Sequence, residues 1–296
     1  MEPKSDRGTD RLRLEAAGKR ASEVVDSLGI SSAPVDPIEI ACTEAPLLHV
    51  IGDNFRDRFD GQLEYHRRRN RFLLFYNTKY DDGSGRLHPR TRFSIAHELG
   101  HFFIERHHSY LFQGGKSHGS CGEFTNSVQV EREADTFAAN LLMPARLIEP
   151  SVDGEPTFLK IRRLADRFQT SVISTAIRWV QLSDLPCAIA AIHDGAVAWI
   201  VPSSPLIRGG CYPKARATTM SPTCREQWEL FRMGGDPSGI ADSTARYWFE
   251  TYDRDDLPGL VVTEEYQAVR VMNLLLVLLA MEEGDLIPEE EEEGED

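Results

Sequence analysis

The stretch that most constrains this chain is the run RFSIAHELGHFF at residues 92–103. His97 and His101 are four residues apart, so on an α-helix they lie on one face, one turn apart. Two imidazoles placed in this way can bind one zinc ion, and the carboxylate of Glu98 next to the first histidine can act as a general base. The apolar flanks favour a buried helix. The sequence therefore predicts His97 and His101 as metal ligands and Glu98 as a catalytic residue.

A second predicted helix begins about thirty residues later and reads VEREADTFAANLLMP, residues 130–144. Zinc needs a third protein ligand and one open position. Glu131 and Asp135 share a helix face, so one can bind the metal while the other accepts a hydrogen bond from a ligating histidine and fixes its tautomer. We expect Glu131 to be the third ligand and Asp135 to orient the histidine. Glu133 points about 160° away from Asp135 on a helical wheel and is the reserve candidate. In the alternative reading, residues 131–133 are a solvated face.

These two segments, RFSIAHELGH followed by EREADTFAANLLMP, resemble the ImmA/IrrE family of zinc metallo-endopeptidases over roughly residues 20–180. The resemblance implies a zincin-like (gluzincin-type) core with one Zn²⁺ per chain, in a soluble bacterial or phage protein. It also implies a protein substrate, a helix-turn-helix (HTH) repressor. Cleavage of such a repressor induces genes for DNA-damage response, mobile-element transfer or phage defence.

Composition and charge argue against two classes of protein, the general nucleic-acid binders and the membrane-spanning proteins. The formal net charge of -14 argues against a general nucleic-acid binder. Residues 282–296 hold much of this charge and read as a disordered, solubilising tail. The N-terminus has no apolar signal region, and the longest apolar run, residues 271–281, is too short to span a bilayer. The cysteines are scattered without a C-x-x-C pair, which favours reduced thiols in a cytoplasm; they are Cys42, Cys121, Cys187, Cys211 and Cys224.

The N-terminal part is predicted to be mixed. We expect disorder over residues 1–10 and a helix over 12–28, followed by a short helix from Pro37. Strands are predicted at residues 47–51, 61–66 and 71–77. The zincin resemblance implies that the last of these, just before the active helix, is an edge strand that pairs with a substrate chain.

For several polar groups we favour a structural interpretation over a functional one. The basic segment at residues 66–71 is predicted to be a solvated hairpin tip, with DNA or an acidic substrate as the alternative. His107, His108 and His118 are assigned to a loop and left out of the metal site. Cys121 lies between the second histidine and Glu131, and a thiolate binds zinc well. We therefore keep Cys121 as a possible inhibitory zinc ligand, against the simpler reading of a small loop residue.

The C-terminal half carries no motif for a ligand. Residues 157–180 predict two short helices that resemble an HTH, and we favour a plain helical hairpin over a DNA-binding element. A β-hairpin is predicted at residues 187–201 with its turn at Asp194-Gly195, and a helix at residues 266–281. Residues 186–281 are interpreted as a small α+β domain with a sensor or regulatory role.

The expected fold class is thus α+β. Residues 1–150 form the zincin-like metallopeptidase core, 151–185 the helical hairpin, 186–281 the C-terminal domain and 282–296 the tail. The expected function is zinc-dependent cleavage of a repressor protein in the cytoplasm, with DNA as a possible activating signal and no membrane partner. The alternative is a non-catalytic, zinc-stabilised DNA-binding regulator, against which the presence of Glu98 argues, since a structural zinc site needs no general base.

Overall fold

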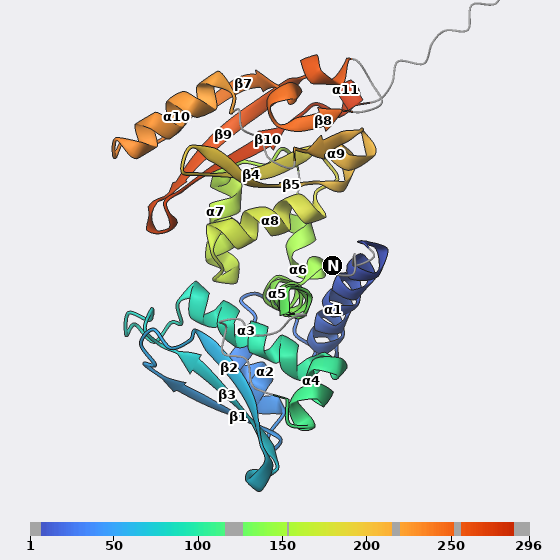
Figure 1. Ribbon diagram of the computed structural model, residues 1–296, viewed down its shortest axis with the longest axis vertical. Helices are drawn as coiled ribbons and strands as arrows, with labels where there is room; N and C mark the ends of the chain where they lie inside the picture. The colour runs from blue at the N-terminus through green and yellow to red at the C-terminus, as the bar shows by residue number, and fades with distance from the viewer. Residues whose placement is uncertain (1–6, 116–126, 153, 215–219, 252–255, 287–296) are drawn as a thin grey trace, which may run out of the picture. The chain divides into compact units, whose positions relative to one another are not determined.

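The computed structural model describes residues 7–115, 127–152, 154–214, 220–251 and 256–286 (Figure 1). Helices and strands are mixed along the chain, so the predicted α+β class is confirmed. The chain forms two compact units, the first built from residues 1–148 and 165–171 and the second from residues 149–164 and 172–296.

The first unit combines a small sheet with helices (Figure 1). Its elements are α1 (Arg7–Ser27), α2 (Pro37–Thr43), β1 (Leu48–Asp53), β2 (Gly61–His66), β3 (Arg71–Asn77), α3 (Pro89–Phe103), α4 (Glu105–Phe112), α5 (Ser127–Leu142) and α6 (Ala145–Ile148). The three strands lie in the order β1-β3-β2, with β1 parallel and β2 antiparallel to β3. Alternate residues of β3, Phe72 and Leu74, point into a core shared with α3 and α5 through Leu99 and Phe137.

Local sequence signals explain where the helices of this unit begin. Asp36 caps α2 by accepting hydrogen bonds from the backbone N–H groups of Ile38 and Glu39, at 2.8 and 3.4 Å. Pro37 and Pro89 occupy the first turns of α2 and α3, where a missing N–H costs nothing. The side chain of His88 completes the start of α3 by accepting from the backbone N–H of Arg90.

Three expectations for this unit are wrong. α1 starts at Arg7, so residues 7–10 are helical rather than disordered. His107 and His108 lie in α4 and not in a loop. β3 is the central strand, and the edge strand beside the active helix is β2, because β3 pairs with β1 on one side and with β2 on the other.

The second unit is organised by a five-stranded antiparallel sheet in the order β5-β4-β10-β9-β7 (Figure 1). Its elements are α7 (Phe158–Phe168, whose last residues cluster with the first unit), α8 (Val172–Leu182), β4 (Cys187–His193), β5 (Ala196–Pro202), α9 (Ser204–Arg208), β6 (Cys211–Pro213), α10 (Pro222–Arg232), β7 (Ile240–Thr244), β8 (Phe249–Thr251), β9 (Val261–Val269), β10 (Leu274–Ala280) and α11 (Glu283–Leu286). The predicted β4–β5 hairpin is confirmed, and its turn residues Asp194 and Gly195 both have positive φ.

The helix expected at residues 266–281 is wrong, since this stretch forms the end of β9 and all of β10. The two strands pair antiparallel and are connected by a short 3₁₀ turn that ends at Asn273. Asn273 has a φ of 52°, a left-handed conformation that asparagine adopts more readily than most residues. An apolar run of this length cannot be assigned to helix or strand by periodicity alone when both of its faces are buried.

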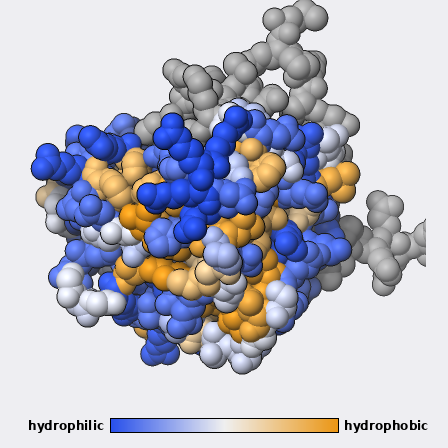
Figure 2. All heavy atoms as spheres, turned by 90° about the horizontal axis from the view of Figure 1, so that it is seen from below, coloured by the Kyte–Doolittle hydropathy of each residue, from blue (hydrophilic) through white to orange (hydrophobic). Residues whose placement is uncertain are grey.

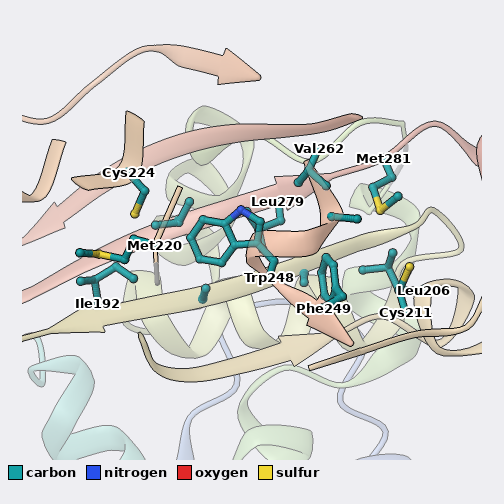
Figure 3. Packing of buried hydrophobic residues seen from close by; sticks show 14 of the residues in the cluster. Ile192, Leu206, Cys211, Met220, Cys224, Trp248, Phe249, Val262, Leu279 and Met281 are labelled. Atoms are coloured by element: carbon teal, nitrogen blue, oxygen red, sulfur yellow. The ribbon is translucent and has the colours of Figure 1, made fainter. Parts of the chain in front are cut away.

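The core of the second unit surrounds Trp248 and Phe249. Figure 3 shows the two rings lying among Met220, Val262 and Leu279, which come from separate parts of the unit. Arg178 of α8 lies in the segment at residues 157–180 that resembles an HTH, and it is only 7% exposed. Burial lowers the pKa of Arg178 to about 10. Arg178 is therefore not part of a surface that could contact DNA.

The surface carries both kinds of side chain. On the face shown in Figure 2, hydrophobic residues lie between hydrophilic ones, as on most protein surfaces. Among the helices of the described residues, none combines the length and apolarity that a membrane crossing requires.

Candidate metal centre

Close contact between two helices creates the site. Gly100 of α3 lies against α5, so that a Cβ atom built on Gly100 would be 3.1 Å from the Cα of Ala134 and 3.2 Å from the Cβ of Phe137. A larger residue would push the helices apart. Because the backbones approach so closely, short side chains from α5 can reach the histidines of α3.

Three side chains converge between these helices. The Nε2 atoms of His97 and His101 are 3.1 Å apart. Glu131 of α5 places its carboxylate 3.2 Å from Nε2 of His97 and 3.7 Å from Nε2 of His101. The three potential ligand atoms lie within 4.8 Å of one another. Both histidines are buried, whereas Glu131 is partly exposed.

This donor set fits a metal ion. The histidines present their Nε2 atoms to a common point, and one carboxylate completes a two-nitrogen, one-oxygen set of the kind used by catalytic zinc sites. Their Nδ1 atoms face away from this point and are engaged elsewhere. His97, His101 and Glu131 are therefore brought together as the sequence predicted, and the reserve candidate Glu133 is not in the group.

Asp135 contacts the first histidine. Its carboxylate is 2.9 Å from Nδ1 of His97. Burial alone would lower the pKa of His97, but hydrogen bonds with Asp135 and Glu131 and the charge of Glu98 raise this pKa to about 10. The contact places Asp135 where the sequence expected an orienting carboxylate.

Glu133 reaches the second histidine indirectly. Nδ1 of His101 is 3.2 Å from Nδ1 of His107, and Nε2 of His107 is 3.1 Å from the carboxylate of Glu133. All three side chains are buried. His107 is thus a site residue that the sequence analysis missed. A signal was available, because His107 and Leu111 are four apart and form the buried face of α4.

Glu98 lies beside the histidines and under the edge strand. Its side chain is almost fully buried and accepts a hydrogen bond from the backbone N–H of Leu63 in β2. A Cβ atom on Gly61 would lie 2.9 Å from Cγ of Glu98, so a glycine at this position lets β2 approach the carboxylate. Burial, together with the charge of Glu131, raises the pKa of Glu98 to about 8, against the opposing effects of His97 and the Leu63 N–H.

Several predicted features lie outside the described residues. Cys121 and His118 belong to residues 116–126, most of the acidic tail belongs to residues 287–296, and the first part of the N-terminal segment belongs to residues 1–6. The beginning of the tail is described, and there the expected disorder is wrong, because Glu283–Leu286 form α11. Any contact of Cys121 with the metal ligands therefore stays a prediction. The cysteines of the described residues, which are Cys42, Cys187, Cys211 and Cys224, are all free thiols.

Comparison with known structures supports the fold. A Mycobacterium tuberculosis transcriptional regulator is similar to this chain with a TM-score of 0.58 and 14% sequence identity, over 93% of this chain and 78% of that one. At this identity the likeness concerns the fold alone. A comparison with curated proteins found no match.

A comparison with protein-family models gives a match over the part of the chain that contains the metal centre. The model of the IrrE N-terminal-like domain, from the M78 peptidase family, matches residues 86–180. The match contains α3 and α5, and with them all three members of the candidate metal group. Residues 86–180 of this chain are therefore similar to the IrrE N-terminal-like domain of the M78 peptidase family, as the two motifs had suggested.

Proposed function

We propose that this protein is a zinc-dependent endopeptidase with a zincin-like core, in which His97, His101 and Glu131 hold the metal. The observation that carries the proposal is the convergence of these three side chains next to a buried glutamate, Glu98. A structural metal site needs no such base, whereas peptide hydrolysis does. A bound zinc ion would supply Lewis acidity toward the scissile carbonyl and lower the pKa of a water molecule.

Glu98 is the proposed general base. Its side chain is buried beside the two histidines, and the positive charge of a bound zinc ion would favour the ionised form that accepts a proton. Glu98 takes the proton of the attacking water and then passes it to the leaving amine. Asp135 holds His97 through Nδ1, so that Nε2 of this ring stays directed at the metal position.

The edge strand β2 is the proposed cradle for the substrate chain. It is an edge strand of the three-stranded sheet, and the backbone N–H of its residue Leu63 donates a hydrogen bond to Glu98. A peptide that adds to this edge as a further strand would have its backbone held in line beside the proposed base. This assignment moves the substrate-binding role from β3, where the sequence analysis had put it, to β2.

The substrate itself is proposed from the family resemblance. A helix-turn-helix repressor is the proposed target, and its cleavage would induce a stress, DNA-damage or phage-defence operon. DNA as the activating signal and the cytoplasm as the compartment belong to the same proposal. The family model supports the peptidase class, and the motifs quoted above support the choice of substrate class.

The test compares wild type with Glu98→Gln on a repressor encoded next to this gene, with zinc measured in both proteins. Glutamine keeps the size of the side chain but cannot accept the proton. We expect wild type to cleave the repressor and Glu98→Gln to retain zinc but lose cleavage by at least about 10²-fold. Equal cleavage by the two proteins would contradict the role of Glu98. Zinc binding by both proteins without cleavage of any repressor would count against the proposed substrate.

A further inference from the structure

A buried chain of side chains runs from the second histidine into the protein. It consists of His101, His107 and Glu133, with donor–acceptor distances of 3.2 and 3.1 Å. His107 is 5% exposed and Glu133 is 1% exposed. Burying a carboxylate costs folding free energy unless the carboxylate is paired, so the hydrogen-bond partners of Glu133 need to be identified.

The order of the atoms fixes the direction of the hydrogen bonds. If Nε2 of His101 binds a metal, the ring proton is on Nδ1 and can be donated to His107. His107 then accepts at its own Nδ1 and carries its proton on Nε2, which faces the carboxylate of Glu133. Every bond in the chain is satisfied by this one set of tautomers. In the alternative tautomer of His101, Nδ1 carries no proton, so His107 would have to donate from its own Nδ1, and its Nε2 would then face the carboxylate of Glu133 without a proton.

Glu133 is held firmly at the end of this chain. Its other oxygen accepts a hydrogen bond from Nε2 of Gln129, at 3.2 Å. Arg106 of α4 forms an ion pair with the same carboxylate. These partners fix the orientation of the carboxylate, so that one of its oxygens stays directed at Nε2 of His107.

We propose that His107 and Glu133 are positioning residues that hold His101 in its metal-binding tautomer. α5 then supplies the third ligand, Glu131, and both anchors for the ligand histidines. Asp135 holds His97 directly and Glu133 holds His101 through an intervening imidazole. Glu133, the reserve candidate for the third ligand, therefore orients a histidine instead of binding the metal. This inference rests on the proposed metal site and adds to it the residues that fix its second histidine.

The test is the zinc affinity of variants at position 107, measured by competition with a chromogenic chelator. His107→Phe keeps a ring but removes both hydrogen bonds, and we expect its zinc affinity to fall on the order of 10–100-fold. His107→Gln carries one acceptor and one donor, as the neutral imidazole does, so it should restore affinity to within a few-fold of wild type. His108→Phe is the matched control. His108 is adjacent on α4 and bonds to the backbone of Phe102 at 3.0 Å, with no contact to His101 among the described residues.

The melting temperature of the metal-free proteins separates positioning from plain stability. If His107 is a positioning residue, zinc affinity depends on its hydrogen bonds and not on the melting temperature. His107→Phe should then bind zinc weakly and His107→Gln should bind it nearly as tightly as wild type, even if the two variants melt at the same temperature. If His107→Phe binds zinc as tightly as His108→Phe and wild type, the proposal is overturned. If His107→Phe does not fold, Glu133→Gln tests the same chain, since loss of its charge should weaken zinc binding several-fold. Unchanged affinity in Glu133→Gln would equally overturn it. Absence of zinc from wild type would instead refute the metal site itself.

Discussion

Gly100 of α3 lies against Ala134 of α5, at a spacing where a Cβ atom on the glycine would be 3.1 Å from the Cα of the alanine. This contact sets the distance between the helix that carries the two histidines and the helix that carries Glu131. The metal group therefore depends on a residue that has no functional atoms of its own.

We predict that Gly100→Val weakens both folding and metal binding. The added methyl groups force the helices apart, and overpacking of this kind typically costs about 1–3 kcal/mol in the free energy of unfolding. Urea unfolding and zinc affinity measure the two effects. Gly259→Ala is the control, because nothing lies within 4 Å of a Cβ atom at that position. Zinc affinity of Gly100→Val equal to that of wild type would show that the helix spacing does not control the site.

The acid stability of the first unit should depend on Asp60, which precedes β2. Burial alone would raise the pKa of Asp60, but Arg90 at 2.6 Å and Lys79 at 3.3 Å outweigh it and lower the pKa below its ordinary value of 3.8. A lowered folded-state pKa means that Asp60 stabilises the protein above pH 3.8. That contribution is lost as the pH falls through the folded-state pKa.

Asp60→Asn tests this dependence. The variant should be less stable than wild type at neutral pH, and the difference should shrink as the pH falls below about 4, where Asp60 of the wild type becomes protonated. Urea unfolding at several pH values gives the comparison. A difference that stays constant down to about pH 3 would contradict the assigned ion pairs.

A buried carboxylate in the second unit should be essential for its stability. Glu264 is fully buried and accepts hydrogen bonds from Nε1 of Trp248 at 2.8 Å, from Oγ of Ser221 at 2.9 Å and from the hydroxyl of Tyr266. Burial and the Glu264 charge raise the pKa of both Tyr266 and Cys224. Ser221 also caps α10, so Glu264 ties that helix to the sheet.

Glu264→Leu should therefore cost at least about 3 kcal/mol, because three buried donors lose their acceptor. Tyr266→Phe removes only one of these bonds and should cost about 1 kcal/mol. The half-exposed Glu229, which makes a surface ion pair with Arg232, gives the control Glu229→Gln, and this change should alter stability by less than about 1 kcal/mol. Denaturant unfolding followed by tryptophan fluorescence measures all three. A cost of Glu264→Leu no larger than that of Glu229→Gln would refute the role of this carboxylate.

The metal centre was more predictable than its surroundings, for physical reasons. Ligand spacing on a helix is a local property, so the spacing of four between His97 and His101, and between Glu131 and Asp135, could be read from the sequence. The partner of a side chain from another element is a tertiary property. For this reason the contact of His107 with His101 and Glu133 could not be read from the sequence.

Strand order was beyond the sequence as well. The stretch at residues 71–77 is the most apolar strand of the first unit because it lies at the centre of the sheet, between β1 and β2. High apolarity thus argued against the edge position that the family resemblance had implied for it. The edge strand β2 alternates between buried and partly buried residues over its first half, and its Gly61 is explained by the close approach of the Glu98 side chain and of the backbone oxygen of Ser94.

The most direct measurement is the zinc stoichiometry of four proteins by native mass spectrometry: wild type, Glu98→Gln, Glu131→Gln and, as a control in the second unit, Glu229→Gln. We predict one zinc ion in wild type, Glu98→Gln and Glu229→Gln, because none of these changes removes a ligand. Glu131→Gln should lose most of its zinc, since it lacks the carboxylate that completes the group with His97 and His101. Wild type without zinc, or Glu131→Gln with a full complement, would contradict the proposed metal centre.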